Sequence, residues 1–317
     1  MADARRGMRK ALKRLTLGAH RAAARLGVHI LPVHYYSPVP DITALAKSKE
    51  LWARRSELPG IDVDLDRQIE TLRQICLPVQ AEYAGNAAYR HGVAHGFGPG
   101  YGYIEAQALH GVVRHYEPRR IVEVGSGVST WCMIEALKRT RHADDASITC
   151  IEPHPSAALG NMEGMRLIEQ PVQTVAFESV FQDLGANDLL FIDSSHAVKP
   201  GSDVNYLVLE ILPRLAAGVI VHFHDIFLPY DYAPDALDTF FHWSETSLVR
   251  AFLIHNPRAR ILFCQSHLHH ERPDALREIF PEYDPEPLSH GLRGKAGRSE
   301  SGDARHFPAS LYIQIQD

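Results

Sequence analysis

The feature that most constrains the fold is a regular alternation of short apolar runs with helical segments from about residue 103 onward. Each apolar run is only a few residues long, which is the pattern of a buried parallel strand. The expected strands are Arg120–Val124, Ile148–Ile151, Leu189–Ile192, Val219–Phe223, Arg260–Cys264 and Leu311–Ile315, and the expected helices are Ile104–His115, Val128–Lys138 and Asp203–Leu212. This alternation predicts an α/β fold in which a mostly parallel sheet is covered by helices on both faces.

Polar residues follow four of these strands at the point where each strand ends. They are the motif Glu123-x-Gly125-x-Gly127, Glu152, the motif Asp193-x-x-His196 and the pair His224-Asp225. Ligands of open α/β sheets bind beyond the carboxyl ends of the strands, which lie at one edge of the sheet. The sequence therefore predicts a single site at this edge.

The glycine motif follows a strand and opens a helix, so it can place backbone N–H groups close to a ligand. It has Thr130 in place of the third glycine of a dinucleotide fingerprint, and it lacks the Gly-Lys-Ser/Thr of a phosphate loop. Glu152 ends the next strand, where a carboxylate can accept hydrogen bonds from ribose hydroxyls. The alternatives are a plain tight turn and a surface glutamate; taken together, the two features favour a nucleoside cofactor.

The remaining strand ends carry carboxylates and imidazoles. Asp193, His196, His224 and Asp225 can converge above the sheet, where two carboxylates and one or two imidazoles can bind a divalent metal ion. His196 can instead act as a general base, because an imidazole with a pKa of about 6.5 can remove a hydroxyl proton near neutral pH. In a purely structural alternative, Asp193 binds only the cofactor and His224-Asp225 forms a turn. His222 is expected to pack in the core or behind the site.

These residues resemble those of the class I S-adenosylmethionine-dependent methyltransferases. The resemblance is carried by Glu123-Val124-Gly125-Ser126-Gly127, by Glu152 and by Leu190-Phe191-Ile192-Asp193-Ser194-Ser195-His196, and it covers roughly residues 100–265. It implies a Rossmann-like sheet of seven strands with the last strand antiparallel. It also implies a site for S-adenosylmethionine formed by Glu123, Gly125, Ser126, Gly127, Ser129, Glu152 and Asp193. In that site the two glycines approach the amino-acid part, Glu152 holds the ribose, and Glu123 orients the loop or the methionine amine.

The pattern of Asp193, His196 and Asp225 is similar to that of the macrocin-type sugar O-methyltransferases. This resemblance implies magnesium on Asp193 and Asp225, with His196 as the base. With His224 added, the candidate ligands of a Mg or Mn ion are Asp193, His224 and Asp225. The acceptor would be a small molecule, namely the hydroxyl of a sugar or of a sugar-bearing natural product. His224 stands where that family has an acidic residue, and imidazole suits Mn or Zn better than Mg. Nitrogen or carbon acceptors stay open, as does the oligomeric state.

The N-terminal segment differs in charge from the rest of the chain. Residues 1–30 carry eight Arg and Lys side chains against one Asp, whereas the remaining residues carry 25 basic and 37 acidic side chains. An acidic body excludes a protein that coats nucleic acid. One apolar stripe is formed by Met8, Leu12, Leu15, Ala19, Ala22 and Leu26. This basic amphipathic arm is a candidate for peripheral membrane contact, for packing on the body or a partner subunit, or for targeting.

The division expected from these patterns is an arm and extended segment (1–40), a helical lead-in (41–102) and a cofactor-binding domain (103–317). Residues 267–308 read as a long polar loop with one helix at Pro273–Ile279, so His267, His269 and His270 form either a metal-binding tract or a solvated loop. Trp243 is expected in a helix core. Four isolated cysteines indicate buried thiols in a reduced, cytoplasmic protein.

Two other classes of function compete with the methyltransferase hypothesis. A metal-dependent hydrolase would use Asp193, His196, His224 and Asp225 without any nucleoside cofactor, and it would leave the glycine turn unexplained. A non-catalytic protein would dock through its basic N-terminal helix, and substitution of His196 would then change nothing measurable.

Overall fold

The computed structural model describes residues 2–31, 33–37, 39–98, 100–160, 162–239, 241–288, 291–293 and 305–317. It contains two compact units, Met1–Trp52 and Ala53–Asp317. The division expected from the sequence placed boundaries near residues 40 and 102 instead. Residues 53–102 belong to the second unit because the apolar face of their helices, including Ile69, Leu72 and Ile75, shares one buried core with the sheet.

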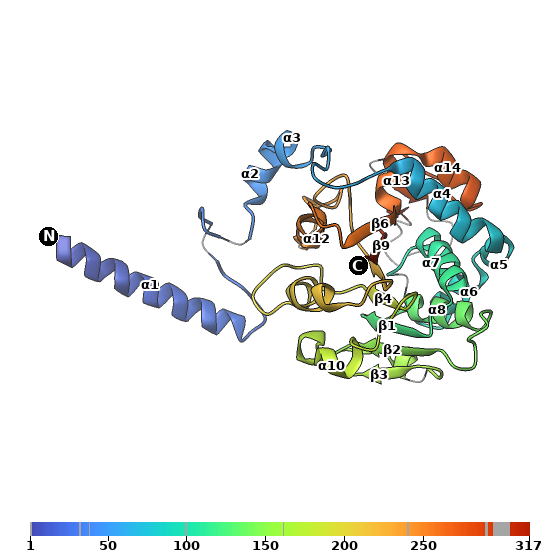
Figure 1. The fold of residues 1–317 in the computed structure, drawn as a ribbon. Coiled ribbons are helices and arrows are strands. Elements are labelled where there is room, and N and C mark those ends of the chain that lie inside the picture. The colour runs from blue at the N-terminus through green and yellow to red at the C-terminus, as the bar shows by residue number, and fades with distance from the viewer. Residues whose placement is uncertain are drawn as a thin grey trace. The chain divides into compact units, whose positions relative to one another are not determined.

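The second unit is built on a seven-stranded sheet in the order β3-β2-β1-β4-β5-β9-β6 (Figure 1). The strands are β1 (Arg120–Val124), β2 (Ser147–Ile151), β3 (Arg166–Ile168), β4 (Leu189–Ile192), β5 (Ile220–Phe223), β6 (Ala259–Cys264) and β9 (Leu311–Ile315). Only β9 is antiparallel to its neighbours β5 and β6 within this sheet. The predicted fold class is therefore confirmed. The sequence missed β3, a half-buried edge strand of three residues.

Helices cover both faces of the sheet. One face packs against α4 (Leu65–Cys76), α7 (Tyr103–Tyr116), α8 (Val128–Leu137), α13 (Gln265–Glu271) and α14 (Pro273–Ile279), with α5 (Gln80–Tyr83) and α6 (Ala87–Ala94) beside them. The other packs against α10 (Phe177–Val180), α11 (Asp203–Tyr206) and α12 (Glu245–Leu253). A single turn, α9 (Ala157–Gly160), follows β2. The predicted helix at 203–212 is α11 continued by a π-helical turn at Leu207–Ile211.

The segment after β6 is more ordered than the sequence suggests. The helix predicted at Pro273–Ile279 is present as α14, but α13 precedes it where a loop was expected. His267 and His269 are buried, and His269 hydrogen-bonds the hydroxyl of Tyr283 at 2.8 Å. The expectation of a solvated histidine loop is therefore wrong, because Tyr283 and the carbonyl of Leu288 satisfy the His269 ring inside the protein. Two short strands, β7 (Leu292–Arg293) and β8 (Arg305–His306), pair antiparallel beyond it.

The first unit contains α1 (Ala2–Ala24), α2 (Ile42–Lys47) and α3 (Lys49–Trp52). The side chains of Met8 and Leu12 lie outside the described part of the chain. Two described members of the apolar stripe, Leu15 and Leu26, are 71% and 83% exposed. No helix among the described residues is both long and apolar enough to cross a membrane. All four cysteines are free and buried, as the sequence predicts.

Glu82 joins two helices of the second unit. Its carboxylate accepts two hydrogen bonds from the guanidinium of Arg114 and one from Nε2 of His110 at 2.9 Å. The hydrogen bonds from Arg114 lower the pKa of Glu82 from 4.5 to about 2. Because the carboxylate pKa is depressed in the folded state, this stabilisation is present above pH 4.5 and is lost as the pH falls toward 2.

We expect Glu82→Gln to lower the free energy of unfolding by about 1–2 kcal/mol at pH 7, because it weakens charge-assisted hydrogen bonds. Urea denaturation measures this loss, and the difference from the native chain should shrink as the pH falls below 4.5. Glu278→Gln is the matched control, since Glu278 pairs with Arg73 on the surface, where water screens the ion pair. Equal losses in the two variants would contradict the prediction.

Candidate active site

The strand register brings the predicted site residues together at one edge of the sheet. Val124 of β1 pairs with Ile192 of β4, and Ile192 pairs with Phe223 of β5. The N–H of Asp193 continues this ladder to the carbonyl of Val124, at 2.9 Å. The residues that follow these strands therefore lie side by side, as the rule for ligand sites of open α/β sheets predicts.

The glycine loop after β1 is braced from below by Glu123. This carboxylate is fully buried and accepts hydrogen bonds from Ser129 Oγ at 2.7 Å and Thr130 Oγ1 at 2.6 Å. Thr130 Oγ1 also accepts the N–H of Gly127 at 3.1 Å. Glu123 and Ser129, both predicted at the cofactor, thus support the loop from inside the protein. Burial raises the pKa of Glu123 to about 7.

The backbone at Gly125 does not tolerate a side chain. Its φ of +94° lies in the left-handed region, and a Cβ atom here would clash with the backbone carbonyl oxygen of Asp193. Gly127 has extended backbone, and the space beside it is bounded by the carbonyl oxygen of Phe97. Glycine at 125 is therefore required by the close approach of the loop to the end of β4.

Glu152 stands beside the glycine loop, as predicted. One of its carboxylate oxygens accepts the Oγ–H of Ser126 at 3.4 Å, and the other accepts the N–H of His154 at 2.8 Å. The side chain is half-buried at the end of β2. A carboxylate held at the rim of a glycine loop can accept hydrogen bonds from a vicinal diol.

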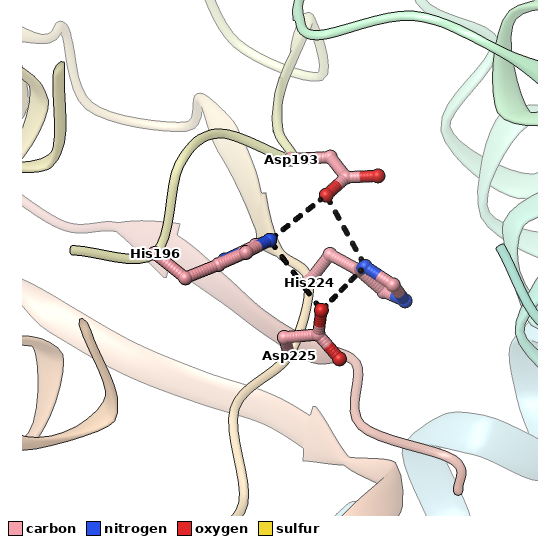
Figure 2. Close-up of side chains that lie close together, drawn as sticks. All are labelled: Asp193, His196, His224 and Asp225. Atoms are coloured by element: carbon pink, nitrogen blue, oxygen red, sulfur yellow. Dashed lines mark hydrogen bonds and ion pairs between the residues drawn. The ribbon is translucent and has the colours of Figure 1, made fainter. Parts of the chain in front are cut away.

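Four side chains at the ends of β4 and β5 form a closed ring, which we call the His–Asp ring: Asp193, His196, His224 and Asp225 (Figure 2). His196 Nε2 lies 3.2 Å from Asp193 Oδ1 and 3.4 Å from Asp225 Oδ2. His224 Nδ1 lies 3.2 Å and 3.5 Å from the same two oxygens. Histidine and aspartate thus alternate around the ring, and the four facing atoms lie within 4.8 Å of one another.

Two members of the His–Asp ring have unusual backbone. His196 has a φ of +55° and Asp225 a φ of +53°, although neither is glycine. Left-handed residues of this kind cost about 1–3 kcal/mol each and concentrate at functional sites. The strain places both side chains on the ring rather than along the strand direction.

Two buried carboxylates hold the outer nitrogens of the imidazoles. Glu245 Oε2, at the start of α12, lies 2.8 Å from His196 Nδ1. Glu105 Oε2, on α7, lies 3.3 Å from His224 Nε2 and 2.9 Å from His306 Nε2. Neither glutamate is predicted from the sequence, because each lies far along the chain from the imidazole that it contacts. Glu105 on α7 is 119 residues from His224, and Glu245 on α12 is 49 residues from His196.

The surrounding charges change the protonation of the imidazoles. Burial alone would lower the pKa of both rings, but the neighbouring carboxylates raise the pKa of His196 to about 10 and that of His224 well above its ordinary value. Burial raises the pKa of Glu105, and the facing imidazoles lower it well below its usual range. The carboxylates around His196 thus favour the protonated form of its imidazole.

Two further residues lie against the His–Asp ring. Trp243 packs its ring 4.8 Å from that of His196 and belongs to the segment before α12, so the expectation of a helix-core tryptophan is wrong. His222 is fully buried, stacks on Phe191 at 4.0 Å and hydrogen-bonds Ser310 Oγ at 2.9 Å. It lies behind the site, as expected.

The donor set of the His–Asp ring fits a divalent cation. Two imidazole nitrogens and two carboxylate oxygens converge, and each imidazole has a carboxylate on its other nitrogen, an arrangement that orients metal-binding histidines. The two aspartate side chains are 27% and 19% exposed, so the ring is open to an incoming molecule on their side. The ring can therefore hold a cation and present it to a substrate.

The strand order, the glycine loop and the polar strand ends define a Rossmann-like domain. Residues 122–226 match the family model described as "Methyltransferase domain". An uncharacterized protein of Archaeoglobus fulgidus is 31% identical to this chain over 172 residues, which make up 49% of this chain and 74% of that protein. The chain belongs to the same family as this archaeal protein.

Two solved methyltransferases are similar to this chain at low sequence identity. The SAH-bound methyltransferase PaMTH1 of Podospora anserina is 18% identical, with 92% of this chain and all of that chain covered and a TM-score of 0.41. The O-methyltransferase TomG of Streptomyces achromogenes, in complex with SAM, is 14% identical, with 78% and 90% covered and a TM-score of 0.39. The fold of this chain is established by the strand order of its own sheet.

We expect Gly125→Ala to lower the free energy of unfolding by about 1–3 kcal/mol, because the new methyl group meets the Asp193 carbonyl in a left-handed backbone. Gly160→Ala is the control, since nothing lies within 4 Å of its Cβ position, and it should change stability by less than about 0.5 kcal/mol. Urea denaturation compares the two, and a neutral Gly125→Ala would disprove the close approach.

Proposed function

We propose that this protein transfers the methyl group of S-adenosylmethionine to a hydroxyl group of a small molecule. The observation that carries this proposal is that Asp193 joins the two halves of the site: its backbone carbonyl abuts Gly125, and its carboxylate belongs to the His–Asp ring. A cofactor on the glycine loop and an acceptor on the ring would then be neighbours, as an in-line displacement requires.

The geometry of the glycine loop supports a set of proposed cofactor contacts. Gly125, Ser126 and Gly127 supply the backbone that approaches the amino-acid part, and Glu152 accepts hydrogen bonds from the ribose hydroxyls. Asp193 borders the cofactor through its backbone. Glu123 and Ser129 act indirectly by holding the loop. In the transfer, the bond from sulfur to the methyl carbon breaks as the bond from the acceptor oxygen forms, which yields a methyl ether and S-adenosylhomocysteine.

The His–Asp ring would orient the acceptor hydroxyl. Asp193, His224 and Asp225 would hold a divalent cation, which when bound lowers the pKa of a hydroxyl and fixes its oxygen. The hydroxyl proton must leave during transfer, and the sequence analysis assigns its removal to His196. Nε2 of His196 does face the ring, but carboxylates occupy both of its ring nitrogens and raise its pKa to about 10.

Aromatic side chains beside the ring favour a sugar or a flat ring as the acceptor. Trp243 packs on His196, and Phe241 stacks on Trp243 with ring centroids 6.1 Å apart. Phe241 is 65% exposed, which leaves an apolar face open next to the site. Aromatic faces of this kind pack against the apolar faces of rings and leave the hydroxyls free. We therefore propose a sugar or sugar-bearing natural product as the acceptor.

Calorimetric titration with S-adenosylmethionine tests the cofactor assignment. We expect binding by the native chain and an affinity about 10–100-fold lower in Glu152→Ala, since hydrogen bonds to a charged partner contribute about 1.5–3 kcal/mol. Glu163→Ala, an exposed acid in the loop after α9, is the control and should bind like the native chain. If the native chain binds no S-adenosylmethionine with or without divalent metal, the methyltransferase proposal fails.

Incubation with methyl-labelled S-adenosylmethionine and a panel of glycosides tests the reaction itself. Label recovered as a base-stable methyl ether supports O-methylation of a hydroxyl. Label on nitrogen or carbon would refute that assignment while keeping the methyltransferase. Metal-dependent bond cleavage without any role for the cofactor would favour the hydrolase alternative.

The arm has a separate proposed role, which is contact with an anionic membrane surface. The supporting observation is that Leu15 is exposed on α1, which also carries Lys13, Arg14 and Arg21, and that Leu26 is exposed in the turn after this helix. Basic side chains near anionic lipid contribute about 1 kcal/mol each, and apolar side chains add the buried area.

We expect the full chain to sediment with phosphatidylserine vesicles at low salt and to ignore purely phosphatidylcholine vesicles. Deleting residues 1–30 should abolish sedimentation and leave the affinity for S-adenosylmethionine unchanged. A full chain that stays in solution with both kinds of vesicle would refute the membrane role.

A further inference from the structure

We infer that His196 is a ligand of a transition-metal ion, so that the His–Asp ring is a two-histidine, two-aspartate centre for a cation such as Zn²⁺, Mn²⁺, Fe²⁺ or Co²⁺ rather than for Mg²⁺. This inference deepens the proposed function, because the role of the metal ion rests on the proposed methyl transfer. It changes the role of His196 from general base to ligand. The proton of a hydroxyl whose pKa the cation lowers would then pass to water on the exposed side of Asp193 and Asp225.

The two imidazoles occupy equivalent positions in the His–Asp ring (Figure 2). His196 and His224 come from different strand ends, yet each directs one nitrogen between the same two aspartate oxygens, at 3.2–3.5 Å. Edges of this length are those of a four-ligand centre with bonds of about 2.0–2.4 Å. Nothing in these distances separates His196 from His224, so a geometry that makes one a ligand makes the other a ligand as well.

Each of the two imidazoles also has a buried carboxylate at its outer nitrogen. Glu245 lies against the outer nitrogen of His196 as Glu105 lies against that of His224, and both glutamates are buried. A carboxylate behind an imidazole fixes the ring and its tautomer and makes the facing nitrogen a better donor to a metal.

The backbone conformation of His196 also suits a metal ligand. Its left-handed φ of +55° turns its ring into the cluster, and Trp243 packs against that ring and limits its movement. Strain that fixes one side chain in one orientation suits a ligand, which must stay in place. The donor set then decides the metal class, because two imidazoles favour Zn, Fe and similar ions, whereas Mg²⁺ prefers oxygen ligands and water.

The test uses the full chain, stripped of metal with a chelator and titrated with Co²⁺ in the absence of S-adenosylmethionine and acceptor. We expect one Co²⁺ per chain, with the strong visible absorption of four- or five-coordinate cobalt, and no displacement by Mg²⁺ in about 100-fold excess. His196→Ala and His224→Ala should each weaken Co²⁺ binding at least about tenfold, and Glu245→Gln about 10–100-fold. His142→Ala, in the loop before β2, should bind Co²⁺ like the native chain.

A second readout counts the imidazoles directly. In the Cu²⁺-loaded protein, electron paramagnetic resonance should detect two coordinated imidazole nitrogens in the native chain and in Glu245→Gln, and one in each histidine variant. Circular dichroism verifies that each variant is folded.

Three outcomes would overturn the inference. Unchanged affinity and two nitrogens in His196→Ala would place His196 outside the metal centre and return it to the role of base. Ready displacement of Co²⁺ by Mg²⁺ would indicate a magnesium site. No Co²⁺ binding at all would mean that the ring holds no such ion. None of these outcomes depends on the calorimetry with S-adenosylmethionine, so failure of the inference and failure of the proposed function can be told apart.

Discussion

The site depends on one constraint, which is that several carboxylates are brought together away from water. Glu105 and Glu245 are buried, and Asp193 and Asp225 are mostly covered beside them. Taking such charges out of water is costly unless positive charge compensates them. The imidazoles of His196 and His224 lie between the carboxylates and supply this charge when protonated, and a bound cation would supply it otherwise. The cluster thus requires positive charge, whether from protons or from a metal.

This requirement also explains the path of the chain after β6. The antiparallel strand β9 is preceded by Ala309 and Ser310, which both donate hydrogen bonds to Glu105 Oε1, at 3.0 Å and 2.7 Å. His306, just before them, reaches the other oxygen of the same carboxylate. The end of the chain therefore completes the sheet and also closes the base of the site beneath His224.

The sequence predicts those parts of the protein that depend on local pattern and on general rules of topology. β1, β4 and β9 have the predicted bounds because their apolar runs are flanked by clear breaks. The glycine loop, Glu152 and the His–Asp ring could be placed together because parallel strands end at the same edge. Glu105, Glu245 and Trp243 could not be predicted, since their position depends on how α7 and α12 pack. The three-residue strand β3 and the buried His269 were missed for a similar reason, because neither has a periodic signal of its own.

The contact between Gly125 and Asp193 fixes the distance between the glycine loop and the His–Asp ring. One residue forms the border of the loop through its backbone and a corner of the ring through its side chain. The spacing between the two halves is therefore set by the covalent bonds within a single aspartate, which are far stiffer than the packing of one loop on another. In a displacement that requires the methyl donor and the acceptor to meet in line, the dimensions of Asp193 would set the spacing between them.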